Sequence, residues 1–130
     1  MATWNGLVDY VRQNYKIAEE TPGSIKLIFA LGNGRSQLVF LWRQELMNDD
    51  EEWLQVESPC AEVGKVSLQR VLEELGNMVC GGAVIIGDHV MVRNSMPLAD
   101  MDVAEFERPL HLVTGTADQL EAKLFGGDRY

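Results

Sequence analysis

The chain has 130 residues, of which 46% are hydrophobic and 24% charged, so we expect one globular domain with its own core, spanning residues 1–130. Twenty acidic residues against eleven basic ones give a formal net charge of −9, which excludes nucleic acid and anionic membrane surfaces as favoured partners.

The beginning of the chain and its cysteines both predict a cytoplasmic protein. The start of the chain has neither the basic nor the apolar region of a secretion signal, and no apolar run is long enough to cross a bilayer. Cys60 and Cys80 lack CxxC spacing, so we expect two reduced, mostly buried thiols, with a disulfide as the less favoured alternative.

The chain opens with an amphipathic helix and then turns to strands. A helix is predicted over residues 3–15, because apolar side chains recur every three or four positions at Trp4, Leu7, Val8, Val11 and Tyr15. Pro22-Gly23 interrupts the chain, and an alternating strand over residues 24–31 follows. Asn33-Gly34, the pair best suited to a type I′ turn, joins it to a return strand over residues 37–45.

The middle of the chain is predicted to complete the first run of strands. Residues 38–42 are apolar on both faces of the return strand, which indicates a central strand covered on each side or one face at a subunit interface. An acidic turn follows, and a third strand is predicted from Trp53 to Val56. Pro59 is expected to end that strand or to confine it to a sheet edge.

The second half of the chain predicts a helix, a hairpin and a final helix. Ser67 caps a helix that ends at Gly76-Asn77, with an expected buried face of Leu68, Val71, Leu72 and Leu75. Gly87-Asp88 joins two strands over residues 83–86 and 89–93. The last helix starts at a capping box of Asp102 and Glu105, and Pro109 should kink or split it before a second piece over residues 116–125.

This order, αβββαββα, resembles the YbjN-like family, whose fold is that of the type III secretion chaperones. The clearest similarity spans residues 66–125: a short helix leading to Asn77, the hairpin at 82–93, then Pro97 and an amphipathic helix containing Ala117-Asp118. The resemblance implies an α+β domain with a single five-stranded antiparallel sheet, helices packed on it, and frequently a homodimer. It implies a regulatory or chaperone-like role and transfers no enzyme active site.

Patterns that could carry chemistry each have a commoner structural interpretation. His89 and His111 have no local catalytic signature, so we expect surface histidines. The acidic run at residues 49–52 lacks the alternating ligands and glycine of a calcium loop. It is predicted to be a solvated loop, although residues 45–62 hold seven acids and no base and could dock a basic partner. The glycines at residues 32–34 lack phosphate-loop spacing. We therefore predict no catalytic residue, metal or cofactor.

Methionine and aromatic residues are the candidates for partner binding. Methionines gather in residues 78–101 and suit either core packing, the commoner role, or a surface that accepts partners. Trp42 and Trp53 lie on adjacent predicted strands: a shared outward face would form an aromatic patch, whereas positions facing the helices would make them core residues. The predicted partner-binding residues are Phe40, Trp42, Trp53, Met78, Met91, Met96 and Met101.

Two hypotheses of function follow. The first is a non-enzymatic, chaperone-like or regulatory protein-binding module that acts as a homodimer and binds a protein segment by β-augmentation or in a groove. The alternative is a small-ligand sensor with an apolar pocket between sheet and helices, lined by Phe29, Phe40 and Trp42, with Arg43 or Arg93 as polar anchor. An enzyme that uses the histidines is the least supported.

Overall fold

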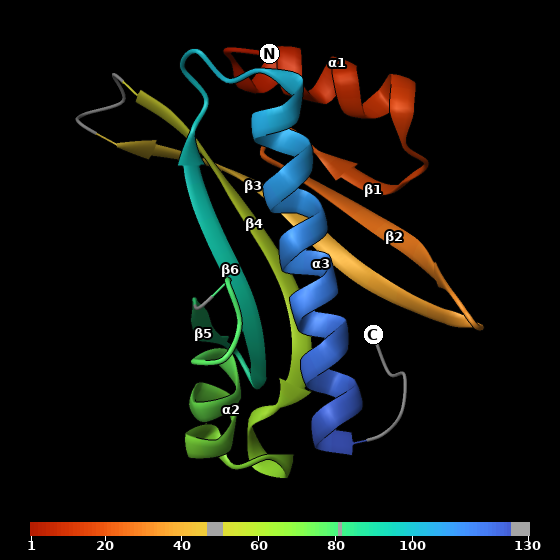
Figure 1. The fold of residues 1–130 in the computed structure, drawn as a ribbon. Coiled ribbons are helices and arrows are strands. Elements are labelled where there is room, and N and C mark those ends of the chain that lie inside the picture. Colours follow the sequence, from red (N-terminus) through yellow and green to blue (C-terminus); the bar gives the residue numbers. More distant parts are fainter. Residues whose placement is uncertain (47–50, 81, 126–130) are drawn as a thin grey trace.

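The computed structural model describes residues 1–46, 51–80 and 82–125 (Figure 1). These residues form an α+β structure with three α-helices and a single antiparallel sheet of six strands in the order β1-β2-β3-β4-β6-β5. The elements along the chain are α1 (Trp4–Asn14), β1 (Ile17–Thr21), β2 (Ser24–Gly32), β3 (Arg35–Leu46), β4 (Glu51–Glu62), a short 3₁₀ helix (Val63–Lys65), α2 (Leu68–Leu75), β5 (Ala83–Ile86), β6 (His89–Pro97) and α3 (Val103–Phe125).

The helices α1 and α3 cover one face of the sheet, and α2 lies beside the end that carries β5 (Figure 1). The core between helices and sheet is made of residues that repeat every three or four positions in the helices and every second position in the strands. Fully covered members include Leu7 and Val11 of α1, Leu110 and Leu120 of α3, and Val39 of β3. No helix in the described part of the chain is long and apolar enough to span a membrane.

Several local signals are confirmed at atomic detail. The Thr3 side chain accepts a hydrogen bond from the Gly6 amide at 3.1 Å, and Ser67 accepts from Arg70 at 3.2 Å, as N-caps do. Asp102 and Glu105 form the reciprocal capping box of α3. In the turn between β2 and β3, Asn33 and Gly34 adopt φ values of 53° and 74°, the two positive values that a type I′ turn requires.

The predicted five-stranded sheet is wrong by one strand, because β1 was not expected. Only Ile17 of its five residues is apolar and partly covered, while the other four are exposed, so no alternating pattern marks this strand. Pro22-Gly23 is the turn of the β1–β2 hairpin, which pairs Thr21 with Ser24 and Glu19 with Lys26. The prediction that this dipeptide interrupts the chain is correct, and the segment before it is a strand at the sheet edge.

The prediction that Pro59 ends a strand or marks a sheet edge is also wrong. Pro59 lies inside β4, a central strand paired with β3 on one side and β6 on the other. Proline can sit there because the described β3–β4 pairing stops at Phe40–Glu57, and a bulge shifts the β4–β6 register between Pro59 and Ala61. The missing backbone donor therefore falls where the ladder is already interrupted.

Two expectations about the helices need correction. Val71 and Leu75 of α2 are buried, but Leu68 and Leu72 are 40% and 62% exposed, because α2 lies at the edge of the sheet. Pro109 does not split the last helix: α3 is continuous from Val103 to Phe125. Proline removes one intrahelical hydrogen bond, and the buried stripe that holds the helix on the sheet outweighs that loss, with Phe106, Leu110, Val113, Ala117 and Leu120 fully covered.

Candidate partner-binding groove

Alternate residues of β3 face opposite sides of the sheet, and both sides are apolar. Val39 and Leu41 are 0% exposed beneath the helices. Leu38 and Phe40 are half-buried and Trp42 is 37% exposed on the other side, which neither α1 nor α3 covers. We call this side the open face. The apolar run of β3 therefore belongs to a central strand whose second apolar face has no cover within the described chain.

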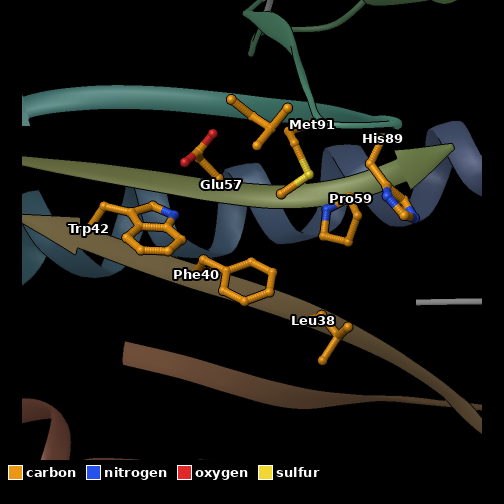
Figure 2. Close-up of a pocket in the computed structure, with 8 residues that line it drawn as sticks. Leu38, Phe40, Trp42, Glu57, Pro59, His89 and Met91 are labelled. Atoms are coloured by element: carbon orange, nitrogen blue, oxygen red, sulfur yellow. The ribbon is translucent and has the colours of Figure 1, made fainter. Parts of the chain in front are cut away.

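A groove of about 350 Å³ crosses the open face (Figure 2). In Figure 2 helix α3 lies behind the sheet, and the side chains that line the groove project from its other side. Four neighbouring strands, β3, β4, β6 and β5, supply them. The open-face groove is lined by Leu38, Phe40, Trp42, Glu57, Pro59, Ile86, His89 and Met91.

The irregular pairing around Pro59 lies next to the groove. Where β3 and β4 stop pairing, the Ser58 hydroxyl donates to the Leu38 carbonyl in place of a backbone amide. The Gln37 side-chain amide donates to the Ser58 hydroxyl and to the Pro59 carbonyl, both at 2.7 Å. Gln37 and Ser58 are both 0% exposed. These buried polar bonds replace ladder bonds between the two strands that carry Leu38 and Pro59, on either side of the groove.

Aromatic rings form one wall of the groove. The Phe40 and Trp42 rings are stacked, with centroids 6.0 Å apart and planes inclined by 18°. The Lys26 ammonium lies 6.0 Å from the Phe40 centroid, at the limit of a cation–π contact. Trp42 and Phe40 thus present large apolar area on a rigid strand, which is how aromatic residues contribute to binding surfaces.

Glu57 lines the groove next to Phe40 and is held there by an ion pair. Glu57 of β4 is 4% exposed, and Arg93, its cross-strand partner on β6, donates to it from Nε at 3.1 Å and Nη2 at 3.0 Å. Both bonds end on the Glu57 oxygen Oε2, so within the described residues Oε1 accepts no hydrogen bond. The wall of an apolar groove therefore contains one hydrogen-bond acceptor with spare capacity.

The predicted partner-binding residues are only partly brought together. Phe40, Trp42 and Met91 line the groove, and Trp53 lies on the same face further along β4, opposite Gln44. Met78 and Met96 are partly buried against the core, and Met101 is 6% exposed within it. Three of the four methionines in residues 78–101 thus have the core-packing role, and their spacing in the chain does not make one surface.

The groove contains residues that sequence patterns did not select. In the sequence Leu38 belongs to an apolar strand, Pro59 marks a strand end or sheet edge and Ile86 belongs to a hairpin, yet all three line the groove. Glu57 was one acid among seven. Its position opposite both Phe40 and Arg93 depends on the register of three strands, a property that no local motif encodes.

The pocket expected between sheet and helices is not formed by its proposed residues. Phe29 lies on the helix side, where its ring meets those of Tyr15 and His111 at centroid distances of 5.4 and 5.8 Å. Phe40 and Trp42 lie on the open face. The sheet separates these aromatic residues, so the three cannot line one cavity.

Each histidine stands beside a carboxylate. His89 Nδ1 lies 2.9 Å from Asp88, and His111 Nε2 lies 3.0 Å from Glu107. Glu107 also accepts hydrogen bonds from the hydroxyls of Tyr10, at 2.6 Å, and Tyr15. Burial by itself raises the pKa of Glu107, but the three donors outweigh it and hold the pKa below its usual value. This cluster ties α1 to α3.

The two cysteines are buried in the core, whereas acidic residues from the middle of the chain lie in a strand and form ion pairs. Cys60 and Cys80 are free and buried, and burial together with the nearby Glu121 charge raises the pKa of Cys60 to about 12. Of the acidic run at residues 49–52, residues 49 and 50 lie outside the described part, while Glu51 and Glu52 belong to β4 rather than to a loop. Arg43 pairs with Glu52, so the acids of residues 45–62 do not form one unpaired edge. Among the described residues no group of three or more histidine, cysteine or carboxylate side chains is placed to hold a metal.

Comparison with known proteins adds no relative from which a site could be transferred. No protein-family model matches the chain, and no curated protein is similar to it in sequence.

Proposed function

We propose that this protein is a non-enzymatic, chaperone-like or regulatory protein-binding module, and that the open-face groove holds an extended apolar segment of its partner. The main support for this proposal is the apolar groove on a sheet face that no helix of the described chain covers. The residues that line it contribute little to the core, so their apolar character has a use outside folding.

The resemblance to the YbjN-like family and the type III secretion chaperones supports the same proposal. The succession of elements follows the expected order, with β1 added at the sheet edge. An antiparallel sheet with helices on one face is compatible with that fold. A chaperone-like protein needs a surface that accepts apolar segments, and the groove offers one.

We also propose self-association through the surface that α2 and β5 form. Leu72 and Ile85 are 62% and 51% exposed, and they belong to a shallow apolar hollow of about 290 Å³ between helix and strand. β5 is an outer strand of the sheet and its residues carry no charge. The other outer strand, β1, contains Glu19 and Glu20, whose charges would repel a second copy. A homodimer therefore fits the β5 edge and does not fit the β1 edge.

The groove is tested with a displayed library of random peptides selected against the purified protein. We expect enrichment of apolar sequences, and loss of at least about tenfold in affinity for a selected peptide on Phe40→Ala or Trp42→Ala. Val103→Ala, which removes an exposed apolar side chain from α3, is the matched control and should bind as the wild type. Absence of enrichment, or equal binding by all variants, would contradict the proposal.

Self-association is tested separately by sedimentation. The wild type should sediment as a dimer, and Leu72→Glu or Ile85→Lys as a monomer with unchanged circular dichroism. Val103→Lys should stay dimeric. A monomeric wild type at the concentrations used for binding would remove the homodimer from the proposal and leave the groove in place.

A small-ligand sensor is the second candidate, because the volume of about 350 Å³ also lies in the range of small-molecule sites. Its location must then be the open face rather than the interior, where Arg93 acts by holding Glu57 in the groove lining. A metabolite that raises the melting temperature of the wild type, but not that of Trp42→Ala, would favour the sensor over the peptide-binding module.

A further inference from the structure

We infer that the open-face groove selects an apolar segment that carries one basic side chain, and that the Glu57 carboxylate binds this side chain by accepting a hydrogen bond from it. The inference rests on the proposed function and gives the partner a chemistry: a peptide with arginine or lysine between apolar residues.

The first support is the state of the carboxylate itself. Glu57 is 4% exposed and lines the groove together with His89 and six apolar residues, and Arg93 uses only its Oε2 oxygen. Within the described residues Oε1 accepts nothing, and a carboxylate oxygen can accept two hydrogen bonds. An occupant that covers the groove removes water from Oε1 and must supply a donor in its place, because a buried acceptor without a donor weakens the complex.

The second support is the pair of rings beside it. Glu57 is the direct cross-strand neighbour of Phe40, and Phe40 stacks with Trp42. An aromatic face attracts cations, and the protein's own Lys26 already lies 6.0 Å from the Phe40 centroid. A guanidinium or ammonium group next to Glu57 would thus meet a carboxylate oxygen and an aromatic face together, whereas an acidic group would meet both unfavourably.

The third support is charge on a larger scale. The chain has a formal net charge of −9, so its electrostatic field attracts basic segments and repels acidic ones. The cations of the open face do not cancel this preference, since Arg93 is bound to Glu57 and Lys26 stands opposite Glu19 on the neighbouring strand. The carboxylate oxygen of Glu57, the neighbouring aromatic face and the negative field of the whole chain therefore all favour a basic side chain.

The experiment uses short synthetic peptides that share one apolar framework and differ only at a central residue: arginine, lysine, citrulline, glutamine or glutamate. Dissociation constants are measured by fluorescence anisotropy on the full chain. We expect arginine and lysine to bind about tenfold more tightly than citrulline and glutamine, and glutamate to bind most weakly.

The variant Glu57→Gln keeps the size of the side chain and removes its charge. It should lose the preference for arginine over citrulline, while Glu19→Gln, on the same face of the sheet, keeps that preference. Equal binding of all five peptides by the wild type would overturn the inference and leave the proposed function standing. A preference that survives in Glu57→Gln would also overturn it. Failure of every apolar peptide to bind would instead contradict the proposed function.

Discussion

The two faces of the sheet are built from the same strands but meet different surroundings. On the helix side, Leu41 and Val56 are fully buried and the side chains interlock with α1 and α3. On the open face, Phe40 and Trp42 occupy the alternate positions and keep a large part of their surface in water. Equal hydrophobicity therefore serves two purposes in one strand: the covered residues stabilise the fold, and the uncovered ones are available for a partner.

The faces also differ in how they treat charge. On the helix side, Glu107 is held by two tyrosines and a histidine, so its bonding partners all come from within the chain. On the open face, Glu57 has one partner within the described part of the chain, Arg93, on one oxygen. Both oxygens of Glu107 are thus bound within the chain, whereas Glu57 keeps one oxygen available for an occupant of the open face.

The largest expected contrast is in stability. Leu41→Ala should lower the free energy of unfolding by about 3 kcal/mol, because it leaves a cavity in a filled core. Phe40→Ala should cost about 1 kcal/mol or less, since its ring loses mainly cross-strand contacts that are already half in water. Urea denaturation of both variants measures the difference. Similar losses would show that the open face belongs to the stabilising core after all.

An intermediate loss of stability is expected for Ser58, whose buried hydrogen bonds on the helix side hold the strands that line the groove on the open face. Ser58→Ala should cost about 2 kcal/mol, because the Leu38 carbonyl and one Gln37 amide hydrogen lose their buried partner. The same variant should weaken peptide binding in the groove through displacement of Leu38 and Pro59. Ser95→Ala on β6, an exposed serine, is the control and should change neither stability nor binding. Unchanged stability in Ser58→Ala would refute the role of these bonds.

The smallest expected effect is on how the stability of the fold depends on pH in the acidic range. The pKa of Glu107 is lowered in the folded protein, so its bonds stabilise the fold above the unfolded value of about 4.5 and the contribution is lost as pH falls through the folded pKa. Glu107→Gln should remove about 1 kcal/mol of stability at neutral pH and flatten the loss toward acid. Denaturation midpoints across this pH range give the curve. Glu19→Gln should run parallel to the wild type, and a Glu107→Gln curve equally steep would contradict the assignment.

Much of the local structure could be predicted from the sequence. The caps at Thr3 and Ser67, the Asn33-Gly34 turn and the capping box at Asp102 are confirmed, because each depends on a few neighbouring residues. β1 could not be found in this way, since four of its five residues are exposed and only its pairing with β2 makes it a strand. The α+β class and the single antiparallel sheet were predicted correctly, with five strands instead of six.

The candidate site was predicted only in fragments. The apolar run of β3 indicated Phe40 and Trp42, and the methionine pattern indicated Met91, yet the same pattern included Met101, which is buried in the core. Glu57 was not distinguished from its acidic neighbours. Methionine spacing in the chain carries no information on which side of a sheet each residue lies, and this decides between core and surface.

The sequence by itself determined where helices and turns begin, because capping, glycine conformation and apolar period act over a few residues. It also determined that one strand is apolar on both sides. Only the tertiary structure decided that Pro59 lies in a central strand, that α1 and α3 cover the same face, and that Glu57 stands between Phe40 and Arg93. These facts depend on strand order and register, which are set by contacts between segments far apart in the chain.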